Sequence, residues 1–145
     1  MLRMLRYYLQ VAQVLSETMH EFGKRRVIFM HSWYTHPESR DKAPGFILRN
    51  FFVPYIVRPS LDGRRLSEEF LESTDHLDYT CIQPAHLLDG PVTDETLMVN
   101  DTDSWVPKAA PVINRADVAG YMLDVIDDES SYRKIRAIGQ QCWDS

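Results

Sequence analysis

Amphipathic helical segments alternate in this sequence with short, continuously apolar runs, and this alternation restricts the possible folds more than any other feature. Apolar residues recur every three or four positions from Leu5 to Phe22, which is the spacing of one helical stripe. The run RVIFMH at 26–31 is short and apolar, and it indicates a buried parallel strand. A second run of this kind, YTCIQP at 79–84, follows a second helical segment. We therefore expect a mainly parallel sheet covered by helices.

Glycine and proline set the expected limits of these elements. Gly23 is expected to end the first helix. Residues 32–45 contain two prolines and many polar residues, which predicts a loop, and proline is expected to break or kink a helix over 46–57. A clean helix is then expected from Ser60, and Pro84 is expected to end the second strand because proline cannot donate to a sheet ladder.

The helix expected from Ser60 has one apolar and one charged side. Its buried side is predicted to consist of Leu61, Leu66, Phe70 and Leu71. Its solvated side is predicted to consist of Arg64, Arg65, Glu68, Glu69 and Glu72.

The C-terminal third is expected to contain a hairpin, a helix and a last strand. Residues 96–100 and 104–106 are predicted to pair across a short turn, and residues 87–91 to form a turn-rich exit from the second strand. Asn114 or Asp117 opens the last predicted helix, and residues 133–138 form the final strand.

Composition excludes several classes of function. The chain has 145 residues, the size of one domain, and a net charge of −5, which argues against binding nucleic acid. No run approaches the ~18 apolar residues of a membrane span. Cys81 and Cys142 form no zinc spacing or disulfide framework, so a reducing, cytoplasmic location is expected. The first 16 residues lack acids, as transit peptides do, but the stripe that continues to Gly23 favours an ordinary helix.

Ligands of parallel α/β sheets bind at the carboxyl ends of the strands. Those ends are expected at His31-Ser32-Trp33 and at Gln83-Pro84-Ala85-His86. We therefore expect the chemistry of the protein in these two segments. His31 and His36 are not accompanied by a recognisable cluster of carboxylates, so no metal site is predicted.

Three segments together carry a resemblance to a known family. They are RVIFMHSW at 26–33, LDYTCIQPAHL at 77–87, and INRADVA at 113–119. In this order and at these separations the sequence resembles the NAD(P)-binding, NmrA-like atypical short-chain dehydrogenases, and within them the flavin reductase and biliverdin reductase B group. The resemblance covers about Met19 to Ile138.

The resemblance implies part of a Rossmann-type domain. The six glycines stand at 23, 45, 63, 90, 120 and 139, and no two of them form a glycine-rich pyrophosphate loop. The expected fold is therefore α/β: residues 1–145 as a single domain, a partial three-layer α/β/α arrangement that lacks the N-terminal β-α-β dinucleotide-binding half. One edge of the strand at 26–31 is then expected to be unpaired and to allow self-association.

The resemblance also implies a site. Ser32 and His86 are the candidate catalytic residues, although Ser32 is equally expected to act only as a strand stop and His86 as a packed loop residue. His31 and Trp33 are bulky enough to fill the space of a substrate ring, and Gly63 offers no side chain where the family can carry a histidine. The residues expected around the cofactor are Met30, His31, Ser32, Gln83, Pro84, Ala85, His86 and Leu87.

The function implied is that of an NAD(P)H-dependent reductase of a flavin, quinone or tetrapyrrole. No tyrosine is followed by a lysine four positions later, which excludes the classical Tyr-x-x-x-Lys chemistry. NAD or NADP is expected to bind weakly to this chain alone, because it has no glycine-rich loop to hold the phosphates. The alternatives are a non-catalytic, NmrA-like dinucleotide-binding regulator and a chain that is inactive by itself.

Overall fold

A four-stranded, mainly parallel sheet forms the centre of the computed structural model, which describes residues 2–41 and 46–141. The order of its strands is β1, β2, β6, β4, and the first three are parallel to one another. The strands span Arg26–Met30 (β1), Asp78–Pro84 (β2), Lys134–Gln140 (β6) and Leu97–Asn100 (β4). The predicted mainly parallel sheet is thus confirmed, and β1 lies at one edge of it.

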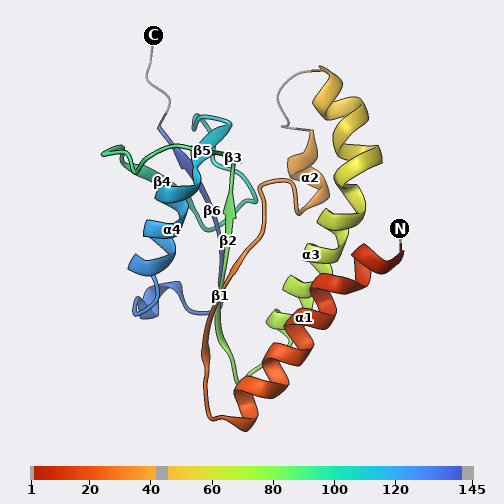
Figure 1. The fold of residues 1–145 in the computed structure, drawn as a ribbon, viewed down its shortest axis with the longest axis vertical. Helices are drawn as coiled ribbons and strands as arrows, with labels where there is room; N and C mark the ends of the chain where they lie inside the picture. The colour runs from red at the N-terminus through yellow and green to blue at the C-terminus, as the bar shows by residue number, and fades with distance from the viewer. Residues whose placement is uncertain (1, 42–45, 142–145) are drawn as a thin grey trace.

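Helices cover both faces of this sheet (Figure 1). Helices α1 (Leu2–Glu21) and α3 (Arg58–Glu72) lie side by side on one face, and α4 (Arg115–Asp124) lies on the other. Successive side chains of a strand point to opposite faces of the sheet, so each strand contributes to an apolar cluster on both faces. In β2, Tyr79 and Cys81 pack toward α1 and α3, whereas Ile82 packs in the cluster that contains residues of α4. The arrangement has the three layers expected from the sequence.

Gly23 ends α1 as predicted. Its φ angle is +63°, a left-handed conformation that glycine adopts without steric cost. The N–H of Lys24 donates to the carbonyl of Met19 at 2.7 Å, which satisfies one of the carbonyls left free at the helix end. The chain can then reverse directly into β1.

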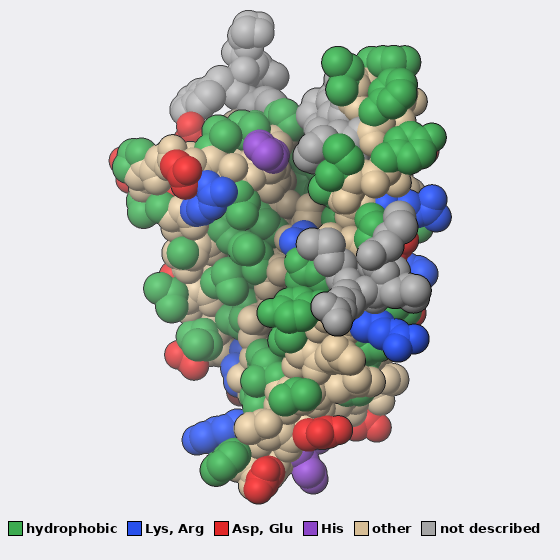
Figure 2. Space-filling model, turned by 45° about the vertical axis from the view of Figure 1, so that its right-hand side comes forward, with side chains coloured by type: hydrophobic (Ala, Val, Ile, Leu, Met, Phe, Trp, Pro, Cys, Tyr) green, Lys and Arg blue, Asp and Glu red, His purple; other side chains and the backbone are tan. Residues whose placement is uncertain are grey.

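The segment between β1 and α3 is helical over more of its length than expected. A single-turn helix, α2 (Pro37–Arg40), lies in the predicted loop. The predicted kinked helix is a π-helix, η1 (Leu48–Val57), which contains Pro54 and runs directly into α3. Proline lacks the N–H that an α-helix requires, and such wider turns occur where the regular pattern is interrupted. Figure 2 shows exposed apolar side chains on η1.

The predicted hairpin is wrong. β4 pairs antiparallel with β6, with Val99 opposite Ile138, and residues 104–106 form no strand. Val106 is instead buried in the core between the sheet and α4. The physical reason is that β4 gives β6 a partner for its second edge, which a local hairpin would have left unpaired.

A second, two-stranded parallel sheet lies where a turn was expected after β2. It pairs β3 (His86–Leu88) with β5 (Val112–Asn114), the strand that leads into α4. Across the described ranges 2–41 and 46–141, no helix is long and apolar enough to cross a membrane. Cys81 is a free, buried cysteine, and Cys142 lies outside the described residues.

Candidate functional site

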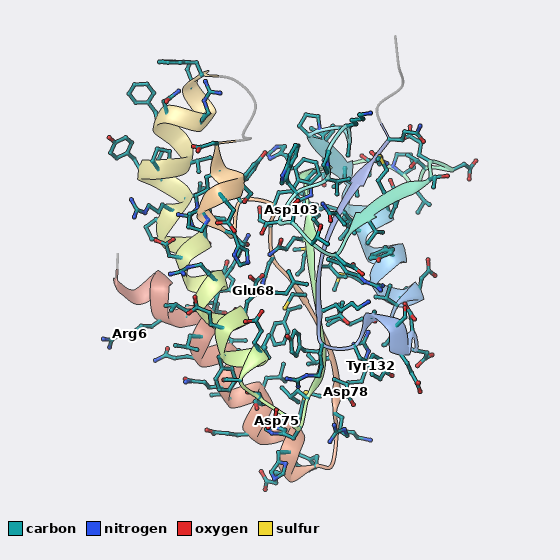
Figure 3. The ribbon with its side chains drawn as sticks, turned by 180° about the vertical axis from the view of Figure 1, so that it is seen from behind. Arg6, Glu68, Asp75, Asp78, Asp103 and Tyr132 are labelled. Carbon is teal, nitrogen blue, oxygen red and sulfur yellow. The ribbon has the colours of Figure 1, made fainter. Side chains whose placement is uncertain are left out.

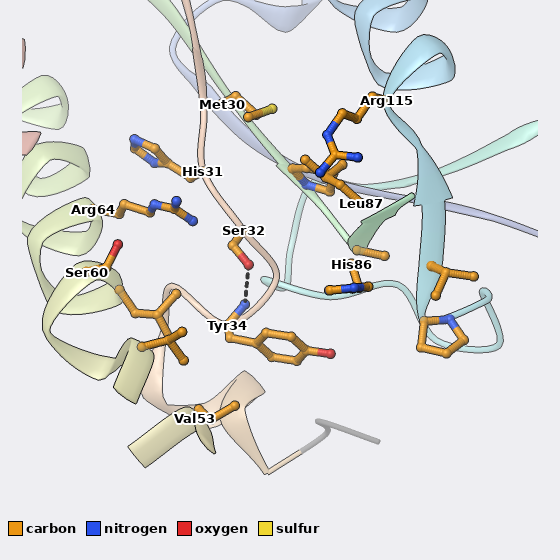
Figure 4. A pocket seen from close by; sticks show the side chains of 16 residues that line it. Met30, His31, Ser32, Tyr34, Val53, Ser60, Arg64, His86, Leu87 and Arg115 are labelled. Atoms are coloured by element: carbon orange, nitrogen blue, oxygen red, sulfur yellow. Dashed lines mark hydrogen bonds between the residues drawn. The ribbon is translucent and has the colours of Figure 1, made fainter. Parts of the chain in front are cut away.

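A cavity of about 480 Å³ opens at the carboxyl ends of β1 and β2 (Figure 4). Seven of the eight residues expected around the cofactor line this cavity. They are Met30, His31, Ser32, Pro84, Ala85, His86 and Leu87. The structure therefore brings together two segments that are more than 50 positions apart in the sequence.

The pairing of β1 with β2 continues past the end of β1 and places these segments side by side. The N–H of His31 donates to the carbonyl of Ile82 at 2.7 Å, and the N–H of Trp33 donates to the carbonyl of Pro84 at 3.1 Å. Because the strands are parallel, both chains leave the sheet at the same edge. The pairing fixes the position of Ser32, which lies between the two bonded residues.

Ser32 is half-buried on the cavity wall. Its Oγ accepts a long hydrogen bond of 3.5 Å from the N–H of Tyr34 (Figure 4). This local contact is the one that a strand-ending serine makes. The same hydroxyl also borders the cavity, so both predicted roles of Ser32 are compatible with its position.

His86 is held by β3 and exposed at the mouth of the cavity. Its N–H donates to the carbonyl of Pro111 at 3.0 Å, and its backbone pairs with Val112. The loop between β2 and β3 is only one residue long, Ala85, because Pro84 ends one strand and His86 begins the next. The backbone of His86 is therefore fixed while its side chain faces a solvent-accessible site.

Gln83 differs from the other predicted residues because it is fully buried and does not line the cavity. Its Nε2 donates to Oε1 of Glu68 at 2.8 Å. Period-two alternation turns its side chain toward α3 instead of the cavity.

Glu68 contradicts the predicted solvated face of α3. It is 1% exposed and lies between α3 and the sheet (Figure 3). Its carboxylate accepts hydrogen bonds from Nδ1 of His31 at 2.5 Å and from Nε2 of His36 at 2.8 Å, in addition to Gln83. Its burial could have been predicted from its spacing, because Glu68 lies two turns after Leu61 and one turn before Leu71, on the apolar stripe of the helix.

The hydrogen bonds to Glu68 keep it ionised. Burial opposes the charge, but the bonds from His31 and His36 outweigh burial and lower the pKa of Glu68 to about 2. The bond with Glu68 in turn raises the pKa of His36, which burial alone would lower. His36 and Glu68 thus form a partly buried ion pair at the end of the segment 31–36, which contains Ser32.

Cys81 lies beside this group. Ligand atoms of His31, Glu68 and Cys81 come within 4.8 Å of one another, so a carboxylate does accompany the histidines, contrary to expectation. Burial raises the pKa of the Cys81 thiol well above its ordinary value, which favours the protonated thiol over the thiolate that a metal requires. The absence of a metal site remains a prediction.

Trp33 does not fill the space of a substrate ring, contrary to expectation. It is 4% exposed, does not line the cavity, and donates from Nε1 to the carbonyl of Ile138 at 2.9 Å. A Cβ at Gly139 would lie 2.8 Å from the indole ring, so the glycine allows this packing. His31 lines the cavity, but Nδ1 of its ring is bonded to Glu68 on α3.

Two arginines on the cavity wall were not predicted as site residues. Arg64 comes from α3, and Arg115 is the first residue of α4. Arg64 continues a series of cavity-lining residues with helical spacing, Val53, Val57 and Leu61, and this spacing was the available signal. Arg115 carried no local signal because the strand pair β3–β5 places it there.

Comparison with known proteins identifies the family. The family model described as NAD(P)H-binding matches residues 6–129, and the chain belongs to this family. The resemblance to NmrA-like atypical short-chain dehydrogenases is thereby confirmed, as is NAD or NADP as the cofactor class. No curated protein matches the chain significantly.

Solved structures with the same fold share little sequence with this chain. A putative NAD-dependent epimerase/dehydratase from Bacillus halodurans has a TM-score of 0.71 and 21% identity, over 94% of this chain and 56% of that one. An oxidoreductase from Lactococcus lactis has a TM-score of 0.70 and 20% identity, over 94% of this chain and 56% of that one. ChuY, an anaerobilin reductase from Escherichia coli O157:H7, has a TM-score of 0.73 and 16% identity, over 95% of this chain and 61% of that one. The chain therefore spans little more than half the length of these proteins.

Proposed function

We propose that this chain is the substrate-side part of an NAD(P)H-dependent reductase of the flavin and biliverdin reductase B type. One observation carries the proposal: seven residues expected around the nicotinamide and substrate rings line one cavity at the carboxyl ends of two parallel strands. The oxidoreductase and anaerobilin reductase among the structural neighbours agree with this class of chemistry. The free, buried Cys81 agrees with a cytoplasmic location, which stays a prediction.

The residues of the cavity fit a dihydronicotinamide ring. Pro84, Ala85 and Leu87 offer apolar surface to an aromatic ring, and Ser32 offers a hydroxyl beside it. When bound, the dinucleotide supplies the hydride for reduction. In this proposal Ser32 orients the reacting rings by a hydrogen bond, and His86 is available to donate the proton that accompanies the hydride.

The phosphates and the nicotinamide ring of a dinucleotide contact different segments of a Rossmann domain. No two glycines of this sequence form the loop that holds a pyrophosphate. In our proposal the chain alone therefore binds the dinucleotide weakly and has little or no activity by itself, although it carries the surface that positions the substrate.

The test is a spectrophotometric assay of NADH or NADPH oxidation with flavin mononucleotide, a quinone and a linear tetrapyrrole as acceptors, in a preparation in which a glycine-rich phosphate-binding half has been supplied to the chain. Turnover that is reduced by His86→Gln supports the proposal. The matched control is His20→Gln, an exposed histidine of α1 that lies away from the cavity. Binding of the dinucleotide without turnover of any acceptor would instead favour a regulatory protein.

A further inference from the structure

The cavity has a charge opposite to that of the chain as a whole. Its described lining contains two arginines, Arg64 and Arg115, and no aspartate or glutamate. The chain itself has a net charge of −5. A cleft lined by one sign of charge attracts ligands of the other sign. This asymmetry suggests that the ligand of the cavity is an anion.

Arg64 is held in place by a neutral partner and keeps its charge available. One Nη donates to the hydroxyl of Tyr8 at 3.2 Å, and the guanidinium lies 5.1 Å from the centre of the Tyr8 ring. The Nε of Arg64 is buried and has no hydrogen-bond partner within the described part of the chain. In the same part of the chain no carboxylate forms an ion pair with Arg64. The guanidinium of Arg64 therefore has no anionic partner within the described part of the chain, and an anionic ligand in the cavity would supply one.

Arg115 stands on the opposite side of the cavity from Arg64 (Figure 4). It contacts Asp89 at 2.5 Å, but the side chain of Asp89 is 93% exposed and that of Arg115 is 55% exposed. Exposed pairs of this kind contribute little and exchange readily. Arg115 is therefore able to turn toward a ligand, whereas Arg64 is the fixed cation.

We propose that the substrate carries an acidic group, a carboxylate or a phosphate, on an otherwise apolar ring system, and that Arg64 binds this group. Val53, Val57 and Leu61 of the same wall provide the apolar surface for the ring. This inference rests on the proposed function and narrows it. Among the acceptors considered, a tetrapyrrole with free carboxylates and a flavin with a phosphate fit the cavity, and a neutral quinone does not.

Flavin mononucleotide and riboflavin provide a direct test, because they share one ring and differ in the phosphate. Binding is measured by quenching of flavin fluorescence, without the dinucleotide, so that failure of the reductase proposal does not affect the result. We expect flavin mononucleotide to bind at least ten times more tightly than riboflavin. Arg64→Met should remove that preference and leave the riboflavin affinity unchanged. Biliverdin and its dimethyl ester form a second pair with the same expectation.

Arg65→Met is the matched control, because Arg65 is the next residue of α3, pairs with Glu69 and does not line the cavity. It should keep the preference for the phosphate, and thermal melts of both variants should show a folded protein. Equal affinities of the wild type for the two flavins would overturn the proposal. The proposal would also be overturned if Arg64→Met weakened the binding of nicotinamide mononucleotide but not that of flavin mononucleotide. Arg64 would then bind the phosphate of the cofactor instead of the acidic group of the substrate.

Discussion

Nδ1 of His31 and Oε1 of Glu68 are 2.5 Å apart, although the residues are separated by 37 positions and belong to the end of β1 and the middle of α3. The second carboxylate oxygen of Glu68 accepts a bond from His36 at 2.8 Å. One buried acid thus holds both ends of the segment 31–36 against α3, and Ser32 lies inside that segment. The position of Ser32 depends on this contact as well as on the sheet.

Removal of the charge of Glu68 should destabilise the protein. Glu68→Gln leaves two histidines without their common anion, and breaking a buried ion pair costs about 3–5 kcal/mol. Urea unfolding measures the loss. Glu69→Gln is the control, because its side chain is 52% exposed and a surface change is expected to stay within about 0.5 kcal/mol. Equal stability of the two variants would contradict the role of Glu68.

The ion pair between Glu68 and His36 should stabilise the protein only within a window of pH. The pKa of Glu68 is lowered from 4.5 to about 2, so its contribution is present above pH 4.5 and is lost as the pH falls toward 2. The pKa of His36 is raised from 6.5, so its contribution is complete below pH 6.5 and is lost as the pH rises through the higher folded value. The stability difference between wild type and His36→Gln should therefore be largest at about pH 4.5–6.5 and shrink on both sides. A difference that does not change with pH would argue against the ion pair.

Ser32→Ala tests whether the serine acts on the reaction. In a preparation that reduces an acceptor with NADPH, we expect turnover to fall by an amount equivalent to about 1–3 kcal/mol, the effect of one hydrogen bond in a buried site. Thermal stability should stay nearly constant, because within residues 2–41 and 46–141 the hydroxyl of Ser32 makes no hydrogen bond besides the long one of 3.5 Å with Tyr34. Unchanged turnover in a folded variant would leave Ser32 with the role of a strand stop.

Affinity for NADPH should be low in this chain alone. The sequence has no glycine-rich turn for the phosphates, and the predicted dissociation constant is above roughly 1 mM, or about −4 kcal/mol at best. Isothermal titration calorimetry measures it directly. A micromolar constant would show that other residues bind the phosphates.

Self-association is expected through β1. Within residues 2–41 and 46–141 no strand pairs with its outer edge, and the run Val27–Met30 contains neither a proline nor a charge that would block pairing with another chain. Size-exclusion chromatography with light scattering should show oligomers. Met30→Lys, at a position that is 44% exposed, should shift them toward the monomer. A monodisperse wild-type monomer would disprove this prediction.

Local patterns in the sequence were sufficient to predict the main elements and the two segments that line the cavity. The stripe that ends at Gly23 predicted α1, and the two apolar runs predicted β1 and β2. The parallel arrangement then placed Ser32 and His86 at the same edge, because parallel strands share their carboxyl ends. These features depend on periodicity and on backbone preferences within a few residues.

Tertiary structure alone decided which polar residues became part of the interior. Glu68 and Glu69 are adjacent and chemically identical, yet only Glu68 is buried, because His31, His36 and Gln83 arrive from distant segments to satisfy its charge. The partner of β4 was likewise decided by the free edge of β6, about 40 residues away. A charged side chain enters a core only when groups elsewhere in the chain compensate its desolvation, and no local pattern records whether they will meet.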